Sequence, residues 1–179
     1  MKIVLIGYMG SGKTYIGLLL SKLLNYPHFD LDEFIECILK IKINYIFKNF
    51  GENYFRKIEK RLLNYFVKNN KSKNWILSLG GGTPCFYNNL KIIKQYSNIS
   101  FYLKNNYKIL FKRLENDNEN RPLLNKYKGK ELLNFIKNHI KIRNKYYNQA
   151  DYIIDTENME FKDIAKYIKN FLLNYDKKF

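Results

Sequence analysis

A glycine-rich segment near the start of the chain has the residue types that bind phosphate groups. Residues 7–14 read GYMGSGKT and match the pattern G-x-x-x-x-G-K-[ST]. In such a loop the glycines let backbone N–H groups point inward around phosphate oxygens, and the following helix adds a favourable field at its N-terminus. Lys13 would reach the β- and γ-phosphates, and the Thr14 hydroxyl would bind Mg²⁺. The segment predicts a nucleotide site, but kinases, motors and switches all use such a loop.

Two aspartates are candidates for acid–base and metal chemistry. Asp30 and Asp32 stand in FDLDE, and residues 27–32 read as a short strand. In an extended segment, side chains two residues apart point to the same side. Asp30 could then hold the waters around Mg²⁺, while Asp32 could orient a substrate hydroxyl or take its proton during phosphoryl transfer. The alternative is that Asp32 only caps the helix that follows.

The arginines are the next candidates, because lysine is the usual cation in this chain. Arginine is preferred where a planar carboxylate or phosphate is held through two hydrogen bonds. Arg56 has Glu59 one helical turn later, which could fix its orientation. Arg121 stands in a polar segment without periodicity, where it could fold over a nucleotide as a cationic finger. A solvated surface position is the alternative for each arginine, namely Arg56, Arg61, Arg113, Arg121 and Arg143.

Three consecutive glycines follow a buried apolar run. Residues 75–79 read WILSL, and Gly80, Gly81 and Gly82 come directly after them in a chain with nine glycines. A tight turn needs one glycine, or two, because each removes side-chain packing and adds backbone entropy to be lost on folding. P-loop enzymes commonly keep a metal-linked aspartate at the end of such a strand. The glycines therefore need an explanation beyond a turn.

Strands and helices alternate along the sequence that must position these residues. Apolar runs predict strands at residues 2–6, 27–32, 75–79, 99–103 and 151–155. Helical spacing predicts helices at residues 13–24, 33–39, 44–50, 89–96, 107–114 and 131–146, and at the C-terminus. Gly51 is expected to break the chain before another helix that runs through residue 67. Residues 115–129 read as a mobile loop. The alternation indicates a parallel sheet covered on both faces, and no repeat or linker divides the chain.

Composition narrows the classes of protein further. The 179 residues suit one well-buried domain, and no apolar run reaches the roughly 18 residues that span a membrane. The N-terminus reads as a first strand rather than a signal peptide. Cys37 and Cys85 fit no metal-ligand spacing and are expected to be free thiols. The net charge of +16 comes from lysines spread along the whole chain, which indicates compositional bias rather than a dedicated polyanion site.

Taken together, several motifs resemble those of the shikimate kinases and occur in the same order. They span the chain from about Lys2 to Asp155 and read GYMGSGKT, FDLD, YFRKIE, LGGGT, NRPLL and R..YY..AD. Only the first motif is specific by itself, but the six motifs in this order are strong evidence for the resemblance. This family belongs to the nucleoside monophosphate kinase group of P-loop folds. The resemblance implies transfer of the ATP γ-phosphate to the 3-hydroxyl of shikimate, on the route to chorismate and the aromatic amino acids.

The resemblance also implies a fold and a setting. The fold would be α/β, a three-layer α/β/α P-loop fold whose sheet has five parallel strands in the order 2-3-1-4-5. One kinase domain would span residues 1–179, with substrate-binding helices over about 33–66 and a mobile lid over about 115–128. We expect a monomer in the cytoplasm that has no specific nucleic-acid partner and no association with membranes.

The resemblance assigns roles residue by residue. The ATP-binding residues would be Gly10, Ser11, Gly12, Lys13, Thr14, Tyr15, Arg113 and Arg121. The shikimate-binding residues would be Asp32, Arg56, Gly80, Gly81 and Arg143, with the two arginines gripping the carboxylate. Lys13, Asp32 and Arg121 would be catalytic, and Mg²⁺ would be held by Thr14 and, through water, by Asp30. The triple glycine, Gly81 especially, would present bare backbone to the hydroxyls of the substrate ring.

The chain departs from the family pattern around the adenine. Arg113, which would lie beside the adenine, is one residue further from Arg121 than expected. Residues 155–160 lack an expected proline, and Tyr15 stands where the family usually has a small residue. Two other functions stay open from the sequence. One is a gluconate-type or other small-molecule P-loop kinase, and the other is a non-catalytic module that binds nucleotides or polyanions. The intact residues Lys13, Thr14, Asp30, Asp32 and Arg121 argue against loss of catalysis.

Overall fold

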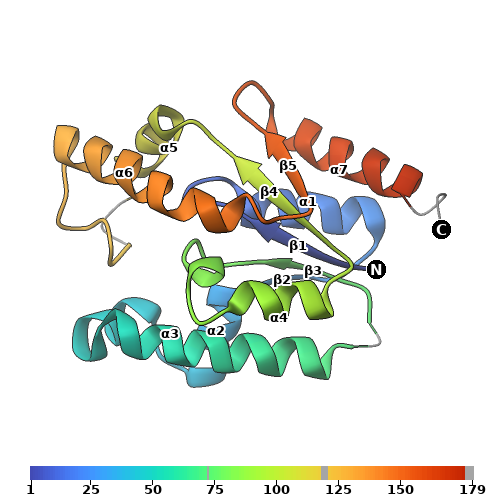
Figure 1. The fold of residues 1–179 in the computed structure, drawn as a ribbon, viewed down its shortest axis with the longest axis horizontal. Helices are drawn as coiled ribbons and strands as arrows, with labels where there is room; N and C mark the ends of the chain where they lie inside the picture. The colour runs from blue at the N-terminus through green and yellow to red at the C-terminus, as the bar shows by residue number, and fades with distance from the viewer. Residues whose placement is uncertain (72, 118–120, 176–179) are drawn as a thin grey trace.

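Five parallel strands form the centre of the computed structural model, which describes residues 1–71, 73–117 and 121–175. The strands are β1 (Lys2–Ile6), β2 (His28–Asp30), β3 (Trp75–Ser78), β4 (Ile99–Lys104) and β5 (Tyr152–Asp155). They are arranged in the order β2-β3-β1-β4-β5, as Figure 1 shows. The five-stranded parallel sheet and its order confirm the prediction from the sequence.

Helices cover both faces of the sheet. They are α1 (Lys13–Leu24), α2 (Leu31–Leu39), α3 (Ile43–Asn69), α4 (Asn89–Tyr96), α5 (Tyr107–Leu114), α6 (Gly129–Tyr147) and α7 (Phe161–Tyr175), with a short 3₁₀ helix η1 (Thr83–Cys85) after β3. Helices α1 and α7 pack together on one face, and α2 to α6 contribute to the core on the other. The three predicted layers are therefore present.

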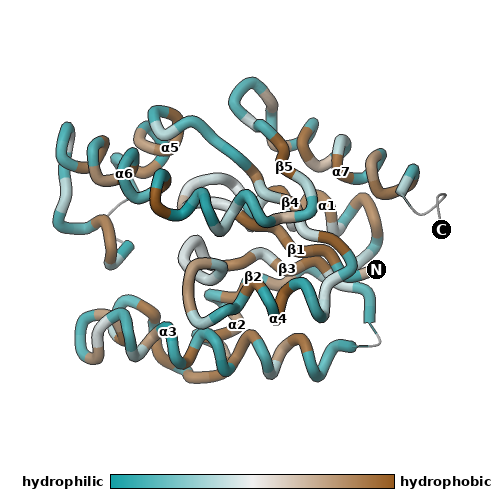
Figure 2. The backbone as a smooth tube through the Cα atoms, viewed as in Figure 1, coloured by the Kyte–Doolittle hydropathy of each residue, from teal (hydrophilic) through white to brown (hydrophobic). Residues whose placement is uncertain are grey.

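The alternation of side chains in β1 explains the two cores. Ile3 and Leu5 pack with the apolar residues of α1 and α7, whereas Val4 and Ile6 pack with those of the opposite face. All four side chains are buried, as expected for a central strand of a parallel sheet. Figure 2 shows the resulting concentration of apolar residues along the central strands. Within the described residues, no helix is both long and apolar enough to cross a bilayer.

The carboxyl ends of three strands meet at one edge of the sheet. Leu5 of β1 and Asp30 of β2 both pair with Ser78, from opposite sides of β3. The glycine-rich loop follows β1, the aspartates follow β2, and the triple glycine follows β3. In an open parallel sheet, ligands bind at this edge. The topology thus brings the three motifs together although they lie far apart in the sequence.

The prediction that residues 27–32 form one strand is wrong at its end. Strand β2 stops at Asp30, and α2 begins at Leu31, so Asp32 lies in the first helical turn. Leu31 and Ile35, four residues apart, are both completely buried, which accounts for the early helix start. Asp30 and Asp32 therefore do not share one side of an extended segment.

Two other local predictions can be compared with the structure. Gly51 interrupts α3 with φ of 78° and ψ of 170°, which confirms the predicted helix break. The predicted lid, residues 115–128, includes residues 118–120, which lie outside the described residues. After them, Leu124 is fully buried in the core, and Tyr127 stacks on Phe135 of α6. The mobility of this segment stays a prediction.

Candidate active site

The glycine-rich loop lines a cavity of about 270 Å³, which we name the phosphate pocket. Its lining residues are Met9, Gly10, Gly12, Lys13, Thr14, Tyr15, Asp30, Asp32, Leu79, Gly80, Gly81 and Arg121. Gly10 and Gly12 have φ of 76° and 88°, the left-handed conformation that glycine adopts without strain. Gly12 precedes the first residue of α1, so the N-terminus of that helix points at the pocket. Backbone N–H groups there favour an anion.

Lys13 bends back over the loop that carries it. Its Nζ atom donates hydrogen bonds of 2.9 Å to the carbonyl oxygens of Gly7 and Tyr8. Burial lowers the pKa of Lys13 from 10.5 to about 8, although the charges of Asp30 and Asp32 oppose this shift. The ammonium group thus stays charged at neutral pH in a setting that a phosphate could neutralise.

Asp30 is the helix cap that the alternative hypothesis assigned to Asp32. Its Oδ1 atom accepts a hydrogen bond of 2.9 Å from the backbone N–H of Asp32, and its Oδ2 atom accepts one of 2.6 Å from the Thr14 hydroxyl. The cap hypothesis for Asp32 is therefore wrong, and the Asp32 carboxylate is left facing both cavities of this edge. The Thr14–Asp30 pair places two oxygen groups beneath the phosphate pocket.

The Asp32 carboxyl has a strongly altered acidity. Burial is the largest cause, and the nearby charges of Asp30 and Glu59 add to it, so the pKa of Asp32 is raised from 3.8 to about 7. Lys13 and Arg56 oppose the rise with their positive charges. A carboxylate with a pKa near 7 is suited to take a proton at neutral pH.

Titration of Asp32 gives a direct test. We expect its carboxyl-carbon NMR signal to move with a midpoint near pH 7 in the protein without ligands, because the buried site disfavours the charged form. The signal can be assigned by its disappearance in Asp32→Asn. A midpoint near pH 4, the ordinary value for an aspartate, would contradict the environment described here.

A second cavity of about 240 Å³ adjoins the first, and we name it the acceptor pocket. Its lining residues are Met9, Asp32, Glu36, Ile43, Asn44, Phe47, Phe55, Arg56, Gly80, Gly81, Gly82, Arg121, Pro122, Leu123 and Arg143. Met9, Asp32, Gly80, Gly81 and Arg121 also line the phosphate pocket. Two molecules, one bound in each cavity, would therefore meet beside Asp32 and Arg121. In Figure 1 the segment that follows residue 120 lies between α6 and the start of α3.

Arg56 is held rigidly in the wall of the acceptor pocket. It is 3% exposed, and its guanidinium donates to both oxygens of Glu59 and to Glu52 over 2.9 Å. Thr83 of η1 donates to Glu59 as well, at 2.7 Å. The predicted Arg56–Glu59 pair is thus confirmed, and the guanidinium lies 4.6 Å from the ring centre of Phe86. Its position is fixed before any ligand arrives.

Arg143 enters the same pocket from α6. It is also 3% exposed, and its guanidinium lies 5.7 Å from the ring centre of Tyr8. In the part of the chain that the structure describes, no carboxylate forms an ion pair with Arg143, whereas Arg56 has two such partners. A buried cation without a counter-ion favours an anionic ligand. Arg61, by contrast, is exposed on the surface of α3.

The three glycines leave room for side chains of the site. None of them has a positive φ, so backbone conformation does not explain them. A Cβ atom on Gly80 would lie 2.7 Å from Asp32 Oδ1, and one on Gly82 would overlap the Arg56 guanidinium. At Gly81 a Cβ atom would lie 3.1 Å from the backbone nitrogen of Met9. The positions thus admit the close approach of Asp32, Arg56 and the glycine-rich loop.

Arg121 and Arg113 lie on the nucleotide side. Arg121 lines both cavities and is oriented by Asp117, whose Oδ2 atom accepts a hydrogen bond of 2.8 Å from it. Arg113 donates to the carbonyl oxygen of Gly10 at 3.1 Å, and its guanidinium lies 4.9 Å from the ring centre of Phe161. A third cavity of about 290 Å³ is lined by Tyr15, Arg113, Met159, Glu160, Phe161 and Lys162.

The structure adds residues that the sequence analysis did not select. Glu52 and Phe47 of α3 and Met9 of the glycine-rich loop contact Arg56 or line the cavities. Tyr147 donates to the carbonyl oxygen of Gly81. Glu52 could have been found, since it stands four residues before Arg56. The contact of Tyr147 joins residues 66 positions apart, and no local pattern indicates it.

Comparison with known proteins identifies relatives along nearly the whole chain. The family model described as Shikimate kinase matches residues 9–173. The shikimate kinase of Flavobacterium psychrophilum is 42% identical over 171 residues, which cover 96% of this chain and 98% of that protein. The shikimate kinase of Flavobacterium johnsoniae is 37% identical with the same coverage.

Solved structures agree with the sequence relatives. A shikimate kinase from Acinetobacter baumannii in complex with shikimate has a TM-score of 0.87 and 31% identity, covering 97% of this chain and 93% of that one. A shikimate kinase from Bacteroides thetaiotaomicron has a TM-score of 0.86 and 31% identity, with coverage of 96% and 98%. A deoxyadenosine kinase from M. mycoides, at 20% identity and a TM-score of 0.64, is similar in fold alone.

Proposed function

The chain belongs to the shikimate kinase family, and we propose here how its own residues carry out that family's reaction. The protein is a kinase that transfers a phosphate group from ATP to shikimate. We assign ATP to the phosphate pocket and shikimate to the acceptor pocket. The observation that supports this assignment most strongly is the pair of buried arginines, Arg56 and Arg143, in a cavity that opens onto Asp32.

The glycine-rich loop would hold the phosphates. Gly10, Ser11, Gly12, Lys13, Thr14 and Tyr15 supply its backbone N–H groups and the start of α1. Lys13 would exchange its bonds to the carbonyl oxygens of Gly7 and Tyr8 for bonds to phosphate oxygens. Arg121, which reaches both cavities, would meet the phosphate group during transfer and stabilise its charge.

The residues beneath the phosphate pocket fit a hydrated Mg²⁺ ion. The described residues contain no cluster of three or more His, Cys, Asp or Glu that could enclose a metal. Mg²⁺ commonly keeps several waters and binds one or two protein oxygens together with phosphates. The Thr14 hydroxyl, 2.6 Å from Asp30 Oδ2, offers that arrangement. Thr14 would hold the ion directly and Asp30 through water, and the bound ion would neutralise charge on the phosphates.

Shikimate would be held by its carboxylate and its hydroxyl groups. Arg56 and Arg143 are buried cations on the wall of the acceptor pocket, suited to a planar carboxylate. Backbone of Gly80 and Gly81 lines the same pocket and would meet the ring hydroxyls. Asp32 would accept the hydrogen of the 3-hydroxyl.

Transfer of the phosphate group from ATP to shikimate needs a group that accepts the hydroxyl proton, and it needs both substrates held in place. The oxygen of the 3-hydroxyl forms a bond to the γ-phosphorus while the bond from that phosphorus to the bridging β,γ-oxygen breaks. The hydroxyl proton passes to the Asp32 carboxylate, and ADP leaves with the negative charge. Lys13 and Arg121 balance the charge that develops on the phosphate oxygens.

The adenine site, the assembly state and the net charge complete the proposal. Arg113, Tyr15 and Phe161 line a cavity beside the glycine-rich loop, and we assign the adenine to it. We propose that the protein acts as a monomer. We attribute the charge of +16 to composition rather than to a nucleic-acid partner.

A coupled assay of ADP release tests the acceptor. We expect rapid ADP release with shikimate and release at background level with gluconate and with nucleoside monophosphates. Gluconate also carries a carboxylate, so it is the more demanding comparison. Comparable kcat/KM values for gluconate and shikimate would contradict the assignment, and the absence of turnover with every acceptor would support a non-catalytic nucleotide-binding role.

A further inference from the structure

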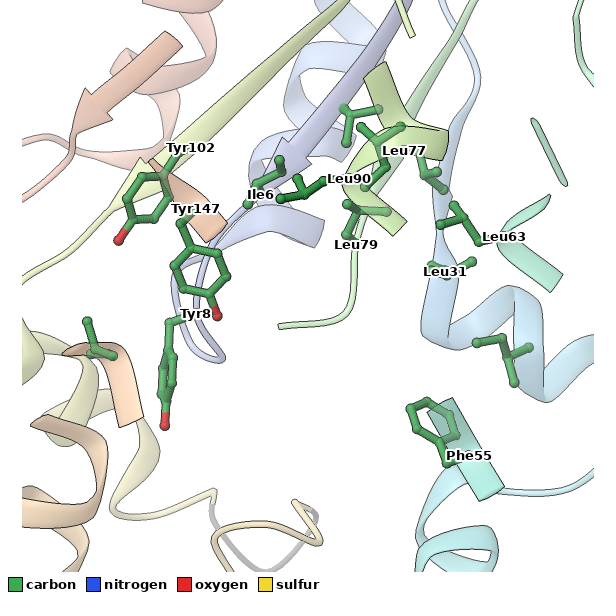
Figure 3. Packing of buried hydrophobic residues seen from close by; sticks show 14 of the residues in the cluster. Ile6, Tyr8, Leu31, Phe55, Leu63, Leu77, Leu79, Leu90, Tyr102 and Tyr147 are labelled. Atoms are coloured by element: carbon green, nitrogen blue, oxygen red, sulfur yellow. The ribbon is translucent and has the colours of Figure 1, made fainter. Parts of the chain in front are cut away.

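Tyr147, the last residue of α6, links two walls of the acceptor pocket. Its side chain is completely buried, and its hydroxyl donates a hydrogen bond of 2.5 Å to the carbonyl oxygen of Gly81. Its ring lies 5.1 Å from that of Tyr102. Figure 3 shows Tyr147 between Tyr102 and Tyr8, with its hydroxyl directed away from the sheet. The tyrosine itself does not line the pocket.

The glycine loop at Gly81 forms one of these two walls, and Arg143, one helical turn before Tyr147 on α6, forms the other. Residues four positions apart lie on the same face of a helix, and the charge of Arg143 opposes the effect of burial on the pKa of Tyr147. Burial raises the pKa of Tyr147, so the hydroxyl keeps its proton through the neutral range. The hydroxyl therefore bonds to the glycine loop from the helix face that also carries a pocket arginine.

The contact with Gly81 also determines where a neighbouring N–H points. The peptide group between Gly81 and Gly82 is planar, and in the trans form its C=O and N–H point in opposite directions. Fixing the Gly81 carbonyl oxygen thus fixes the Gly82 N–H. Across the described residues, the N–H groups of Gly81 and Gly82 donate to no protein acceptor, although Gly82 is buried. They are available to an acceptor atom of a ligand.

We propose that Tyr147 is a positioning residue for the phosphate acceptor, because its hydroxyl sets the orientation of the Gly81–Gly82 peptide beside Arg143. The proposal rests on the function proposed above, since the backbone of Gly81 and the side chain of Arg143 are assigned there to shikimate. Shikimate would then find its donors already oriented, and less binding energy would be lost in ordering them.

The variant Tyr147→Phe removes the hydroxyl and keeps the ring. We expect the KM for shikimate to rise about tenfold, because the hydrogen bond that orients the Gly81–Gly82 peptide is lost, with a smaller fall in kcat and an unchanged KM for ATP. Tyr102→Phe is the matched control. Its hydroxyl donates to Asn144 at 3.0 Å and its ring packs on Tyr147, so loss of this hydroxyl should leave both KM values unchanged.

A measurement without substrate separates this proposal from the assigned function. In Tyr147→Phe, the amide NMR signal of Gly82 and the Nε–H signal of Arg143 should shift, while Tyr102→Phe should leave them in place. If wild-type protein does not phosphorylate shikimate, the assigned function fails, and the NMR comparison still decides the positioning role. Wild-type values of KM for shikimate together with unshifted signals would reduce Tyr147 to a packing residue. Melting temperatures of both variants would show any loss of stability.

Discussion

Replacing Asp32 with asparagine is expected to lower kcat for shikimate by about 10²-fold or more. Asparagine keeps the shape of the side chain but removes its charge and its ability to take a proton. The carboxyl of Asp32 has its pKa raised to about 7 at the junction of the two cavities, so wild-type protein has a base available at neutral pH. The affinity for ATP should barely change, because the glycine-rich loop is untouched.

Glu33→Gln is the matched control for that variant. Glu33 lies beside Asp32 in the first turn of α2 but is exposed and lines neither the phosphate pocket nor the acceptor pocket, so its loss removes the same charge outside the site. Its kcat should equal that of wild-type protein. Turnover of Asp32→Asn within about threefold of wild type would show that the carboxylate has no essential role in the transfer.

Asp32→Asn, which is expected to lower kcat, should raise the stability of the folded protein. The pKa of Asp32 is higher in the folded protein than in the unfolded chain, so the unfolded chain binds fewer protons between about pH 4 and about pH 7. The contribution of this group to stability therefore falls as pH rises through that interval. Asp32→Asn should melt at a higher temperature than wild type above pH 7, and the difference should shrink toward pH 5. A catalytic carboxylate is here a source of instability.

Much of the fold and of the site could be predicted because the motifs are local. Residues 7–14 contain all the groups that form the phosphate loop, and the loop occurs between a strand and a helix as its chemistry requires. Parallel strands then place the ends of β1, β2 and β3 at one edge. Asp30, Asp32 and the glycines follow these strands, so their meeting follows from the order of elements.

The end of β2 shows where a local pattern is ambiguous. Phe29 and Leu31 alternate with aspartates, which is typical of a strand, but Leu31 and Ile35 also have helical spacing. The core decides between the two, because α2 buries both apolar side chains against α3 and the sheet. The capping role then passes to Asp30, whose side chain is in place to accept the Asp32 N–H.

Contacts between residues far apart in the chain could not be predicted from the sequence. Glu59 was expected to orient Arg56 because both lie on one helix, but the bond from Thr83 to Glu59 depends on how η1 packs against α3. The contact between Tyr147 and Gly81 depends in the same way on the packing of α6 beside the sheet. Such contacts are set by the whole fold, so they can be read only from the structure.

The substitution Gly82→Ala should have the second large effect. A methyl group there would overlap the Arg56 guanidinium, which Glu52 and Glu59 hold in a buried position. The arginine must move before the protein can fold with alanine at this position. A displacement of about 1 Å in a bound reactant can cost about 10²-fold in rate, so we expect kcat/KM for shikimate to fall by about that factor. The KM for ATP should remain near the wild-type value.

Comparison with Gly129→Ala distinguishes lost space from lost backbone freedom. Gly129 has φ of 48° with nothing within 4 Å of an added Cβ atom, so alanine there should lower the melting temperature without changing shikimate kinetics. Gly82 has no positive φ, so its substitution should change the kinetics strongly and act on stability only through the displaced arginine. Saturation kinetics with shikimate and melting curves on both variants measure the two effects separately. Unchanged shikimate kinetics in folded Gly82→Ala would mean that the glycine is not needed to admit Arg56, and that this arginine does not hold the substrate where we place it.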